Sequence, residues 1–167
     1  MIVPPLGLGR SSHLAWRLDR VDFAATWASG EGARRTGGRW NSKGRRAVYA
    51  SLDAATAILE VAVHKGFHVL DTVPHVLTAF EVIDPADIHV VDPASLPNPH
   101  WLRPGLPSLG QREHGDRLLA DHVFVALPST VAPHGWNLVF DPDRAAGRWV
   151  ERLKEPFALD GRLHPAP

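Results

Sequence analysis

The sequence contains no cysteine, and that absence alone excludes several classes of protein. A chain of 167 residues without cysteine forms no disulfide framework, binds no metal through thiolates and has no thiol nucleophile. The sequence also has no excess of either charge, since 18 basic residues balance 18 acidic ones. A neutral chain lacks the overall cationic field that drives non-specific binding to nucleic acids or anionic membranes. Zinc fingers and cysteine hydrolases are therefore excluded, and binding of a long polyanion over the whole surface is disfavoured.

Long apolar runs are missing as well. No stretch approaches the roughly 20 apolar residues that a membrane-spanning helix needs. Residues 1–10 contain two prolines and two glycines and have no basic segment ahead of an apolar one, unlike a signal peptide. We therefore expect a cytoplasmic protein that does not bind membranes. The length suits one domain over residues 1–167, with a core at about 14–163 and an N-terminal extension at 1–13.

Glycine and proline, by contrast, are abundant. The 14 glycines and 15 prolines imply short elements joined by many turns, which argues against a helical bundle. Residue pattern predicts strands at 14–18, 47–50, 76–83, 88–91, 123–127 and 137–140, and an edge strand or helix at 148–157. It also predicts a helical turn at 22–28 and helices at 54–63 and 109–121, the first capped by Ser51 or Asp53 and ended by Lys65-Gly66. A mixed α+β fold follows.

Two segments are predicted to lack regular structure. Residues 29–46 show no apolar periodicity and are expected to be a loop or a loosely paired segment, and residues 92–108 are expected to be a long surface excursion. Residues 29–46 contain five glycines and six basic residues against one acidic residue, so this segment has a net charge of +5 and the remainder −5. Glycines allow close approach of a ligand and arginines hold phosphate groups, so the segment suits a phosphate-bearing small molecule; the alternative is a solvated basic loop. Trp40 either anchors this loop or offers a stacking face. The five prolines in 92–108 indicate either a lid over a site or a plain connector.

Glu60 is the most informative single residue. It is the only ionisable residue between positions 54 and 63, in a helix that is apolar nearly all round and is therefore predicted to be buried. An isolated buried carboxylate is costly. Glu60 is thus expected either at the wall of a cleft, where it can act in catalysis, or in a structural salt bridge with a loop arginine.

Several common motifs are absent. No Gly-Lys-Ser or Gly-Lys-Thr completes a phosphate-binding loop, and Arg35 stands where a dinucleotide motif has its third glycine. His64 and His68 have a metal-ligand spacing, but Gly66 between them is expected to end the helix, so we expect no metal site. Ser129 lacks the flanking glycines of a nucleophile elbow. The usual nucleotide-loop, zinc-protease and esterase motifs therefore do not describe this chain.

A set of short blocks instead shares its spacing with one known family. The blocks are Gly32-Ala33-Arg34-Arg35-x-Gly37-Gly38-Arg39-Trp40-Asn41, Val48-Tyr49-Ala50-Ser51, Leu59-Glu60-Val61-x-x-His64, Leu127-Pro128-Ser129 and Asn137-Leu138-Val139-Phe140-Asp141-Pro142. This pattern resembles the RES-domain toxins of bacterial toxin–antitoxin pairs, a family named for Arg, Glu and Ser. The resemblance covers residues 16–163, nearly the whole chain.

The resemblance implies a fold, a substrate and a partner. The implied fold is that of ADP-ribosyltransferases of the diphtheria-toxin type, an α+β single domain with a mixed sheet core and flanking helices. The implied substrate is NAD, with no prosthetic group and no metal. Such toxins cleave the nicotinamide–ribose bond with water or phosphate as the acceptor and deplete cellular NAD, whereas some relatives transfer ADP-ribose to a protein. The implied partner is an Xre-like antitoxin, and both a homo-oligomer and a hetero-oligomer with that antitoxin stay open.

The resemblance also assigns roles to individual residues. Arg17 and Arg39 match the family's arginines and are expected to hold the pyrophosphate of NAD. Tyr49 matches its tyrosine and is expected to stack on nicotinamide. Glu60 matches its glutamate and is expected to stabilise the oxocarbenium-like centre, while Ser129 matches its serine and is expected to orient the ribose or nicotinamide by hydrogen bonding. Glu60, Arg39 and Tyr49 are the expected catalytic residues; Arg17, Arg39, Tyr49 and Ser129 are the expected NAD-binding residues.

Two further points bear on these expectations. Leu18 stands where some relatives have a tyrosine, so stacking is expected to fall on Tyr49. The alternative from another functional class is a non-enzymatic nucleic-acid binder that uses the arginines of 29–46. Trp40 is the only aromatic residue of that segment, so the stacking faces that single-stranded nucleic acid requires are missing, and no nucleic-acid partner is expected.

Overall fold

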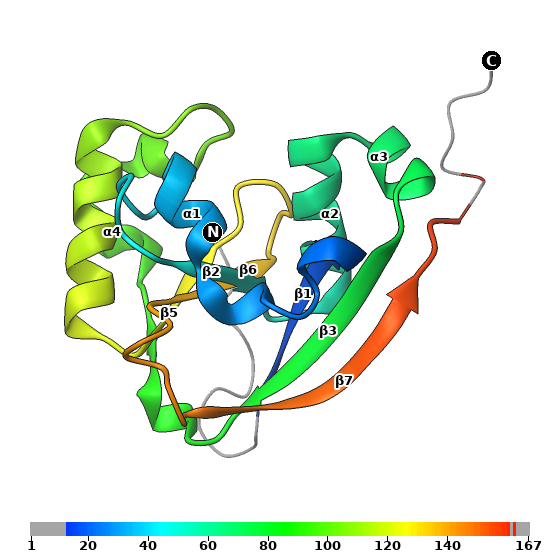
Figure 1. Ribbon diagram of the computed structural model, residues 1–167. Helices are drawn as coiled ribbons and strands as arrows, with labels where there is room; N and C mark the ends of the chain where they lie inside the picture. Colours follow the sequence, from blue (N-terminus) through cyan, green and yellow to red (C-terminus); the bar gives the residue numbers. More distant parts are fainter. Residues whose placement is uncertain (1–12, 161, 163–167) are drawn as a thin grey trace.

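A computed structural model describes residues 13–160 and 162, and it contains seven strands and four α-helices (Figure 1). The N-terminal extension expected at 1–13 lies outside the described residues except for His13, and so does the expected core end at 163. The strands are β1 (His13–Arg20), β2 (Val48–Ser51), β3 (His75–Val82), β4 (Ile88–Val90), β5 (Phe124–Pro128), β6 (Trp136–Phe140) and β7 (Trp149–Phe157). The helices are α1 (Glu31–Thr36), α2 (Ala54–Lys65), α3 (Phe67–Thr72) and α4 (Leu109–Asp121).

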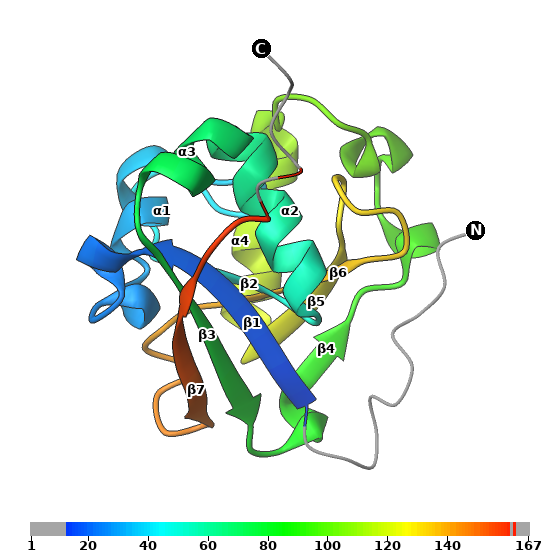
Figure 2. The same ribbon diagram turned by 90° about the vertical axis from the view of Figure 1, so that its right-hand side faces the viewer.

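The strands form one sheet in the order β4-β5-β6-β2-β1-β3-β7. Only β4 and β5 are parallel; all other neighbours are antiparallel. β1 pairs with β3 at every residue from 13 to 20, yet it meets β2 at a single pair, Trp16 with Ser51. The sheet therefore consists of two halves, β4-β5-β6-β2 and β1-β3-β7, joined by a narrow bridge (Figure 2).

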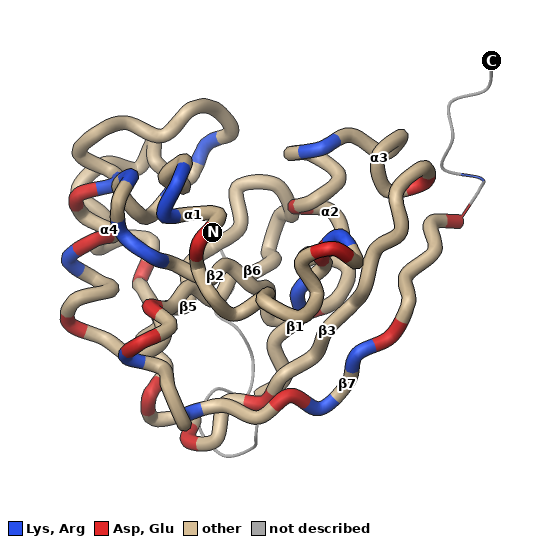
Figure 3. Tube along the Cα trace, viewed as in Figure 1, with Lys and Arg blue, Asp and Glu red and all other residues tan. Residues whose placement is uncertain are grey.

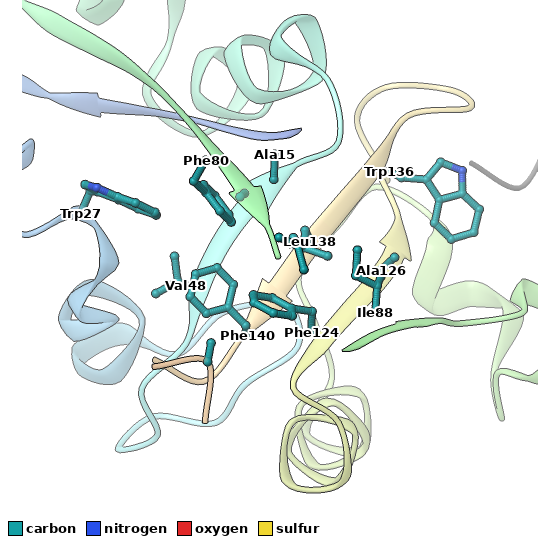
Figure 4. Packing of buried hydrophobic residues seen from close by; sticks show 13 residues of the cluster. Ala15, Trp27, Val48, Phe80, Ile88, Phe124, Ala126, Trp136, Leu138 and Phe140 are labelled. Carbon is teal, nitrogen blue, oxygen red and sulfur yellow. The ribbon is translucent and has the colours of Figure 1, made fainter. Parts of the chain in front are cut away.

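Alternation along the strands separates the apolar side chains onto two faces. One face carries a central cluster that runs across both halves of the sheet (Figure 4). The other face carries two separate clusters, an α4 cluster over β5, β6 and β2 and an α2 cluster over β1 and β3. The central cluster includes Ala15, Trp27, Val48, Phe80, Phe124, Leu138 and Phe140; the α4 cluster includes Trp40, Tyr49, Leu119, Val125, Leu127 and Val139; the α2 cluster includes Trp16, Leu18, Ala62, Leu70 and Leu77.

Most predicted elements are confirmed, and so is the α+β fold class. Every predicted strand is present within a few residues of its expected bounds, and residues 148–157, left open as strand or helix, form the edge strand β7 against β3. The helical turn expected at 22–28 is two 3-10 turns, Val21–Phe23 and Trp27–Ser29. α4 has the predicted bounds, and α2 begins after Asp53, whose Oδ1 accepts a hydrogen bond from the Thr56 N–H at 2.7 Å. Helix α2 ends at Gly66, which has a φ of 86°.

The prediction that all of 29–46 is a loop or a loosely paired segment is wrong, because residues 31–36 form α1. This helix follows Gly30, with a φ of 69°, and ends at Gly37, with a φ of 72°. Both glycines adopt the positive φ that other residues avoid, so they delimit a helix instead of preventing one. α1 buries none of its residues, which explains why no apolar periodicity indicates it.

The prediction that α2 is buried on all sides is also wrong. Thr56, Ala57 and Ala62 are buried, whereas the side chain of Val63 is 60% exposed. The helix packs on β1 and α3 with one side, and no part of the described chain covers the other. Its apolar composition comes largely from small alanines, which make a helix hydrophobic without making every face a core face. In residues 13–160 and 162, no helix has the length and apolar character to cross a membrane.

Candidate active site

Glu60 projects from α2 with its side chain 20% exposed. Its Oε1 accepts two hydrogen bonds, one from Ser129 Oγ at 2.8 Å and one from Asn137 Nδ2 at 2.6 Å. Its Oε2 lies 4.0 Å from His64 Nδ1 and accepts no hydrogen bond from any other described residue. No arginine of the described chain forms an ion pair with Glu60, so the geometry gives no support to a structural salt bridge with a loop arginine. One carboxylate oxygen is held in place and the other is available to a ligand.

The residues that hold Glu60 belong to a polar row on the sheet. Tyr49 and Val139 are paired on β2 and β6 and lie in the α4 cluster. The next residues on the same face are Ser51 and Asn137, also paired, and Ser51 Oγ donates to Asn137 Oδ1 at 2.8 Å. This row lies at the end of the α4 cluster, where the sheet passes to the half that α2 covers. Glu60, on α2, is hydrogen bonded to Asn137 of this row where the two halves of the sheet meet.

Ser129 follows β5 directly and is fixed by a turn. Its Oγ accepts hydrogen bonds from the backbone N–H groups of Val131, at 3.0 Å, and Ala132, at 2.9 Å. A hydroxyl has one proton to donate, and here that proton goes to Glu60. In this geometry Ser129 therefore holds Glu60 in position and has no second proton to donate to a ligand.

Arg17 lies at the narrow bridge between the two half-sheets. Its Nε and Nη2 each donate to the carboxylate of Asp19 at 2.7 Å, and its Nη1 donates to the backbone carbonyl of Tyr49 at 2.6 Å. Because a guanidinium has five N–H donors, two remain for a ligand. Groups on β1 and β2 thus hold the guanidinium of Arg17 in place before any ligand binds.

Tyr49 is held by the segment that carries the family motif. Its hydroxyl donates to Asn41 Oδ1 at 2.7 Å and accepts from the Trp40 N–H at 2.9 Å. Burial raises the pKa of Tyr49 well above its usual value, so the phenol stays neutral. A Cβ at Gly38 would lie 2.4 Å from this hydroxyl, so the approach requires glycine. Trp40 is 2% exposed in the α4 cluster and therefore anchors the loop; it is not a stacking face.

Arg39 connects this segment to the proline-rich stretch 92–108. Its Nη2 donates to the carbonyl of Gly105 at 2.8 Å and its Nη1 to that of Trp101 at 3.4 Å. Burial lowers the pKa of Arg39, and the negative charge of Glu60 opposes that shift. Among the described residues, Arg39 forms no ion pair with Glu60, and its hydrogen bonds go to the two backbone carbonyls. The proline-rich stretch does more than connect two elements, because it contacts a predicted site residue.

The predicted site residues are therefore brought together in linked pairs. Glu60 and Ser129 are hydrogen bonded, Arg17 is bonded to the backbone of Tyr49, and Arg39 interacts electrostatically with Glu60. Sequence reasoning assigned no role in the site to Ser51, which it considered only as a helix cap, or to Asn137, although both lie in the family blocks. The signal that could have found them is the shared alternation of Tyr49-x-Ser51 and Asn137-x-Val139, which places two polar residues on a face that is otherwise apolar.

Two other sequence observations have a structural outcome. Leu18 is 4% exposed in the α2 cluster, so it packs in the core and offers no stacking face. His64 lies on α2 and His68 on α3, with Gly66 between the helices. Within the described chain, no group of three metal-ligating side chains gathers at this or another point.

Comparison with known families matches residues 14–160 to the family described as the RES domain. The chain belongs to the RES-domain family. Every predicted site residue of this RES-domain chain lies within the matched range. A relative named Toxin Res, from Photorhabdus laumondii subsp. laumondii, is 30% identical over 154 residues, which are 90% of this chain and 96% of the relative. A relative from a Sphingobium species, named Prs ADP-ribosylating toxin, is 31% identical over 146 residues, covering 83% of this chain and 88% of the relative.

A solved structure supports the fold of this RES-domain chain. A chain from the crystal structure of the M. tuberculosis MbcT-MbcA toxin-antitoxin complex superposes with a TM-score of 0.71. The match covers 89% of this chain and 85% of that chain, at 21% sequence identity. At this identity the likeness concerns the fold, which is the one that the sequence resemblance implies.

Proposed function

We propose that this RES-domain chain is the toxin of a type II toxin–antitoxin pair and that it cleaves the nicotinamide–ribose bond of NAD. The observation that carries the proposal is the geometry of Glu60. Two donors hold Oε1, while Oε2 accepts no hydrogen bond from the described residues and lies 4.0 Å from His64 Nδ1. Such a fixed carboxylate suits a reaction in which positive charge develops next to it. The names of the relatives support the toxin assignment.

The proposed chemistry follows the charges. The bond between the ribose C1′ and the nicotinamide nitrogen breaks, and its electron pair leaves with neutral nicotinamide. The ribose is left with oxocarbenium character, which a nearby carboxylate oxygen stabilises, as in glycoside cleavage. Glu60 Oε2 is that oxygen, either facing C1′ or holding a ribose hydroxyl. Water or phosphate then forms the new bond to C1′ and gives up a proton.

In the proposal, Arg17, Arg39 and Tyr49 bind NAD. Arg17 has two unused N–H donors and Arg39 has three, counted from the bonds that each makes, and both suit a pyrophosphate. The ring of Tyr49 is half-buried while its hydroxyl is tied to the loop, which leaves its face to stack on the nicotinamide. A cationic pyridinium over an aromatic face gains further stabilisation.

A second candidate is transfer of ADP-ribose to a protein. The name of the Sphingobium relative, an ADP-ribosylating toxin, is the observation that favours it. The same residues release nicotinamide in both reactions, and only the acceptor differs. The acceptor therefore distinguishes the candidates, and product analysis identifies it.

The proposed partner is an Xre-like antitoxin encoded with the toxin. Support comes from the structural neighbour, which is a chain of a toxin–antitoxin complex. NAD is a cytoplasmic metabolite pool, so the proposed activity places the protein in the cytoplasm. We propose that one RES domain, over 1–167, carries the entire activity.

The decisive experiment compares wild-type protein with Glu60→Gln. Purified protein is incubated with NAD, with and without phosphate, and the products are identified by mass spectrometry. Glu60→Gln keeps the size and shape of the side chain but removes its negative charge, so the rate of NAD consumption should fall by about 100-fold or more. Glu113→Gln, at an exposed glutamate of α4, is the matched control and should keep full activity.

Each product pattern has a clear meaning. Free ADP-ribose indicates hydrolysis, a phosphorylated ADP-ribose indicates phosphorolysis, and label from biotinylated NAD on a protein band indicates the second candidate. Consumption of NAD by Glu60→Gln at the wild-type rate would overturn the assignment of Glu60.

A further inference from the structure

We infer that Asn137, anchored by Ser51, is a positioning residue that holds the carboxylate of Glu60 in its reactive geometry. The catalytic meaning of this inference rests on the proposed NAD cleavage, but the contact itself does not. Asn137 Nδ2 donates to Glu60 Oε1 at 2.6 Å, and Asn137 Oδ1 accepts from Ser51 Oγ at 2.8 Å. The three side chains form a relay from β2 through β6 to α2.

The chemistry of the groups fixes the direction of this relay. An ionised carboxylate only accepts hydrogen bonds, whereas an amide has one accepting end and one donating end. With the amide turned the other way, Asn137 Oδ1 would face Glu60 Oε1 at hydrogen-bond distance without a proton between them, and the two oxygens would repel. The carboxylate of Glu60 thus sets the orientation that points Nδ2 at Oε1. The hydroxyl of Ser51 then donates to the amide oxygen and gives Asn137 a second anchor in that orientation.

The relay has a rigid base. Ser51 and Asn137 are directly paired in the β2–β6 ladder, and Ser51 is 2% exposed. Both therefore belong to the sheet, whereas Glu60 belongs to α2, a helix whose outer side is exposed. Asn137 thus fixes a side chain of the helix to the centre of the sheet. A carboxylate with several rotatable bonds needs such a tie, because misplacement of a reacting group by about 1 Å can cost on the order of 100-fold in rate.

The two carboxylate oxygens of Glu60 also differ in their hydrogen bonds. Ser129 and Asn137 both donate to Oε1 and neither donates to Oε2. Two donors from two strand ends fix the plane of the carboxylate as well as its position. Without Asn137, the hydroxyl of Ser129 would be the single remaining donor to Oε1, and the plane of the carboxylate would no longer be fixed.

The kinetic test uses Asn137→Ala, Ser51→Ala and Ser51→Thr. Because the substrate-binding residues stay intact, Asn137→Ala should lower kcat for NAD cleavage by about 10- to 100-fold with KM changed by less than about threefold. Ser51→Ala should lower kcat by a smaller factor, and Ser51→Thr, which keeps the hydroxyl, should restore much of it. Asp84→Ala is the control: Asp84 caps a 3-10 turn between β3 and β4 by accepting from the Ala86 N–H at 2.9 Å, and within the described chain it makes no hydrogen bond to a residue of the site.

A spectroscopic test does not depend on activity. In ¹⁵N-labelled protein, the side-chain amide of Asn137 should give two well-separated proton signals, one of them shifted by its bond to a carboxylate. Glu60→Gln and Ser51→Ala should each move these signals, whereas Asp84→Ala should leave them in place.

The outcomes separate the two proposals. Wild-type kcat in Asn137→Ala, or an amide signal that is the same in Ser51→Ala as in wild type, overturns the positioning role. A change in KM alone would make Asn137 a substrate-binding residue and would also overturn it. If wild-type protein consumed no NAD, the proposed function would fail, and the amide signals would still decide whether the relay exists.

Discussion

Tyr49 is the single tyrosine of the chain, so its ionisation can be followed without interference from another tyrosine. Burial raises its pKa above the usual 10.0, which means that the unfolded chain loses this proton at a lower pH than the folded one. Stability from this group is complete below about pH 10 and is then lost by about 1.4 kcal/mol per pH unit. Urea unfolding across this range, with phenolate absorbance recorded in parallel, checks the prediction.

The variant Tyr49→Phe isolates this contribution. It leaves Asn41 Oδ1 and the Trp40 N–H without their partner, so the free energy of unfolding at neutral pH should fall by about 1–3 kcal/mol. The alkaline loss assigned to Tyr49 should then be absent. If Tyr49→Phe and wild type lost stability in parallel above pH ~10, the enclosed phenol would not be the cause. Because the ring is kept, NAD cleavage should survive in the folded variant.

At the level of residues, sequence reasoning found charge more readily than hydrogen bonding. Glu60 could be found because a lone carboxylate in an apolar helix needs an explanation, and its family motif agrees with it. Asn137 was missed, although it opens one of the family blocks, because one amide at the start of a strand has many ordinary uses and its alternation with Val139 gains meaning only beside β2. What gives Asn137 its place is the pairing of β6 with β2, a contact between residues far apart in the sequence.

Among the elements, α4 is placed by a glycine. A Cβ at Gly115 would lie 2.2 Å from the backbone oxygen of Trp40, so this helix touches the backbone of the 29–46 segment. Gly115→Ala should force the two apart and lower the free energy of unfolding by about 1–3 kcal/mol. It should also lower NAD cleavage, because the displaced segment carries Arg39. Thermal unfolding and a rate assay on the same sample measure both effects.

Gly110→Ala on the same helix is the matched control. The nearest atom to its Cβ would be Trp101 Cζ2, at an ordinary contact distance of 3.8 Å. Replacing a helical glycine by alanine without a clash stabilises by about 0.5–1 kcal/mol. Equal effects of the two substitutions would contradict the proposed close contact at Gly115.

The elements that the sequence predicted well are those whose signal is local. The strand at 123–127 and the helix at 109–121 show the residue types and caps of their class, and both are present with nearly the expected bounds. α1 was missed because it is six residues long and buries nothing. The exposure of α2 depends on what lies over its outer side, and no pattern within the helix reports that. The single pair that joins β1 to β2 is likewise a property of packing.

For the molecule as a whole, the net charge of zero reflects acidic and basic side chains that lie close together in the fold. Arg45 and Arg46, at the end of the basic 29–46 segment, pair with Asp141 and Asp143, which follow β6. Within the segment itself, Arg34 pairs with Glu31 at 2.9 Å. Figure 3 shows basic and acidic positions interspersed over the elements of the chain. The cationic segment predicted from the sequence is thus neutralised in part: the two aspartates, with one negative charge each, reduce its net charge from +5 to +3.

This local balance predicts weak binding of nucleic acids. A labelled single-stranded 20-base oligonucleotide should bind with a Kd weaker than about 100 µM at ~150 mM salt, since Arg34, Arg45 and Arg46 are in ion pairs and only half of the segment's six basic residues remain to meet phosphates. Fluorescence anisotropy over a salt series measures the affinity and its slope. Tight binding with a slope of about −4, the value expected for a single strand if the segment's six basic residues all met phosphates, would favour a nucleic-acid binder over an NAD-cleaving enzyme.

The double variant Asp141→Asn and Asp143→Asn sharpens this test. Asparagine keeps the Oδ1 at position 141 that accepts from the backbone N–H of Asp143 at 2.9 Å, so the turn should persist while Arg45 and Arg46 lose their counter-charges. The variant should bind the oligonucleotide more tightly at low salt, with a slope steeper by about 1–2. Its kcat for NAD should stay near the wild-type value, because neither aspartate contacts Glu60 or the residues that hold it. An unchanged salt slope would mean that these ion pairs do not shield the arginines, and that the weak binding of wild type has another cause.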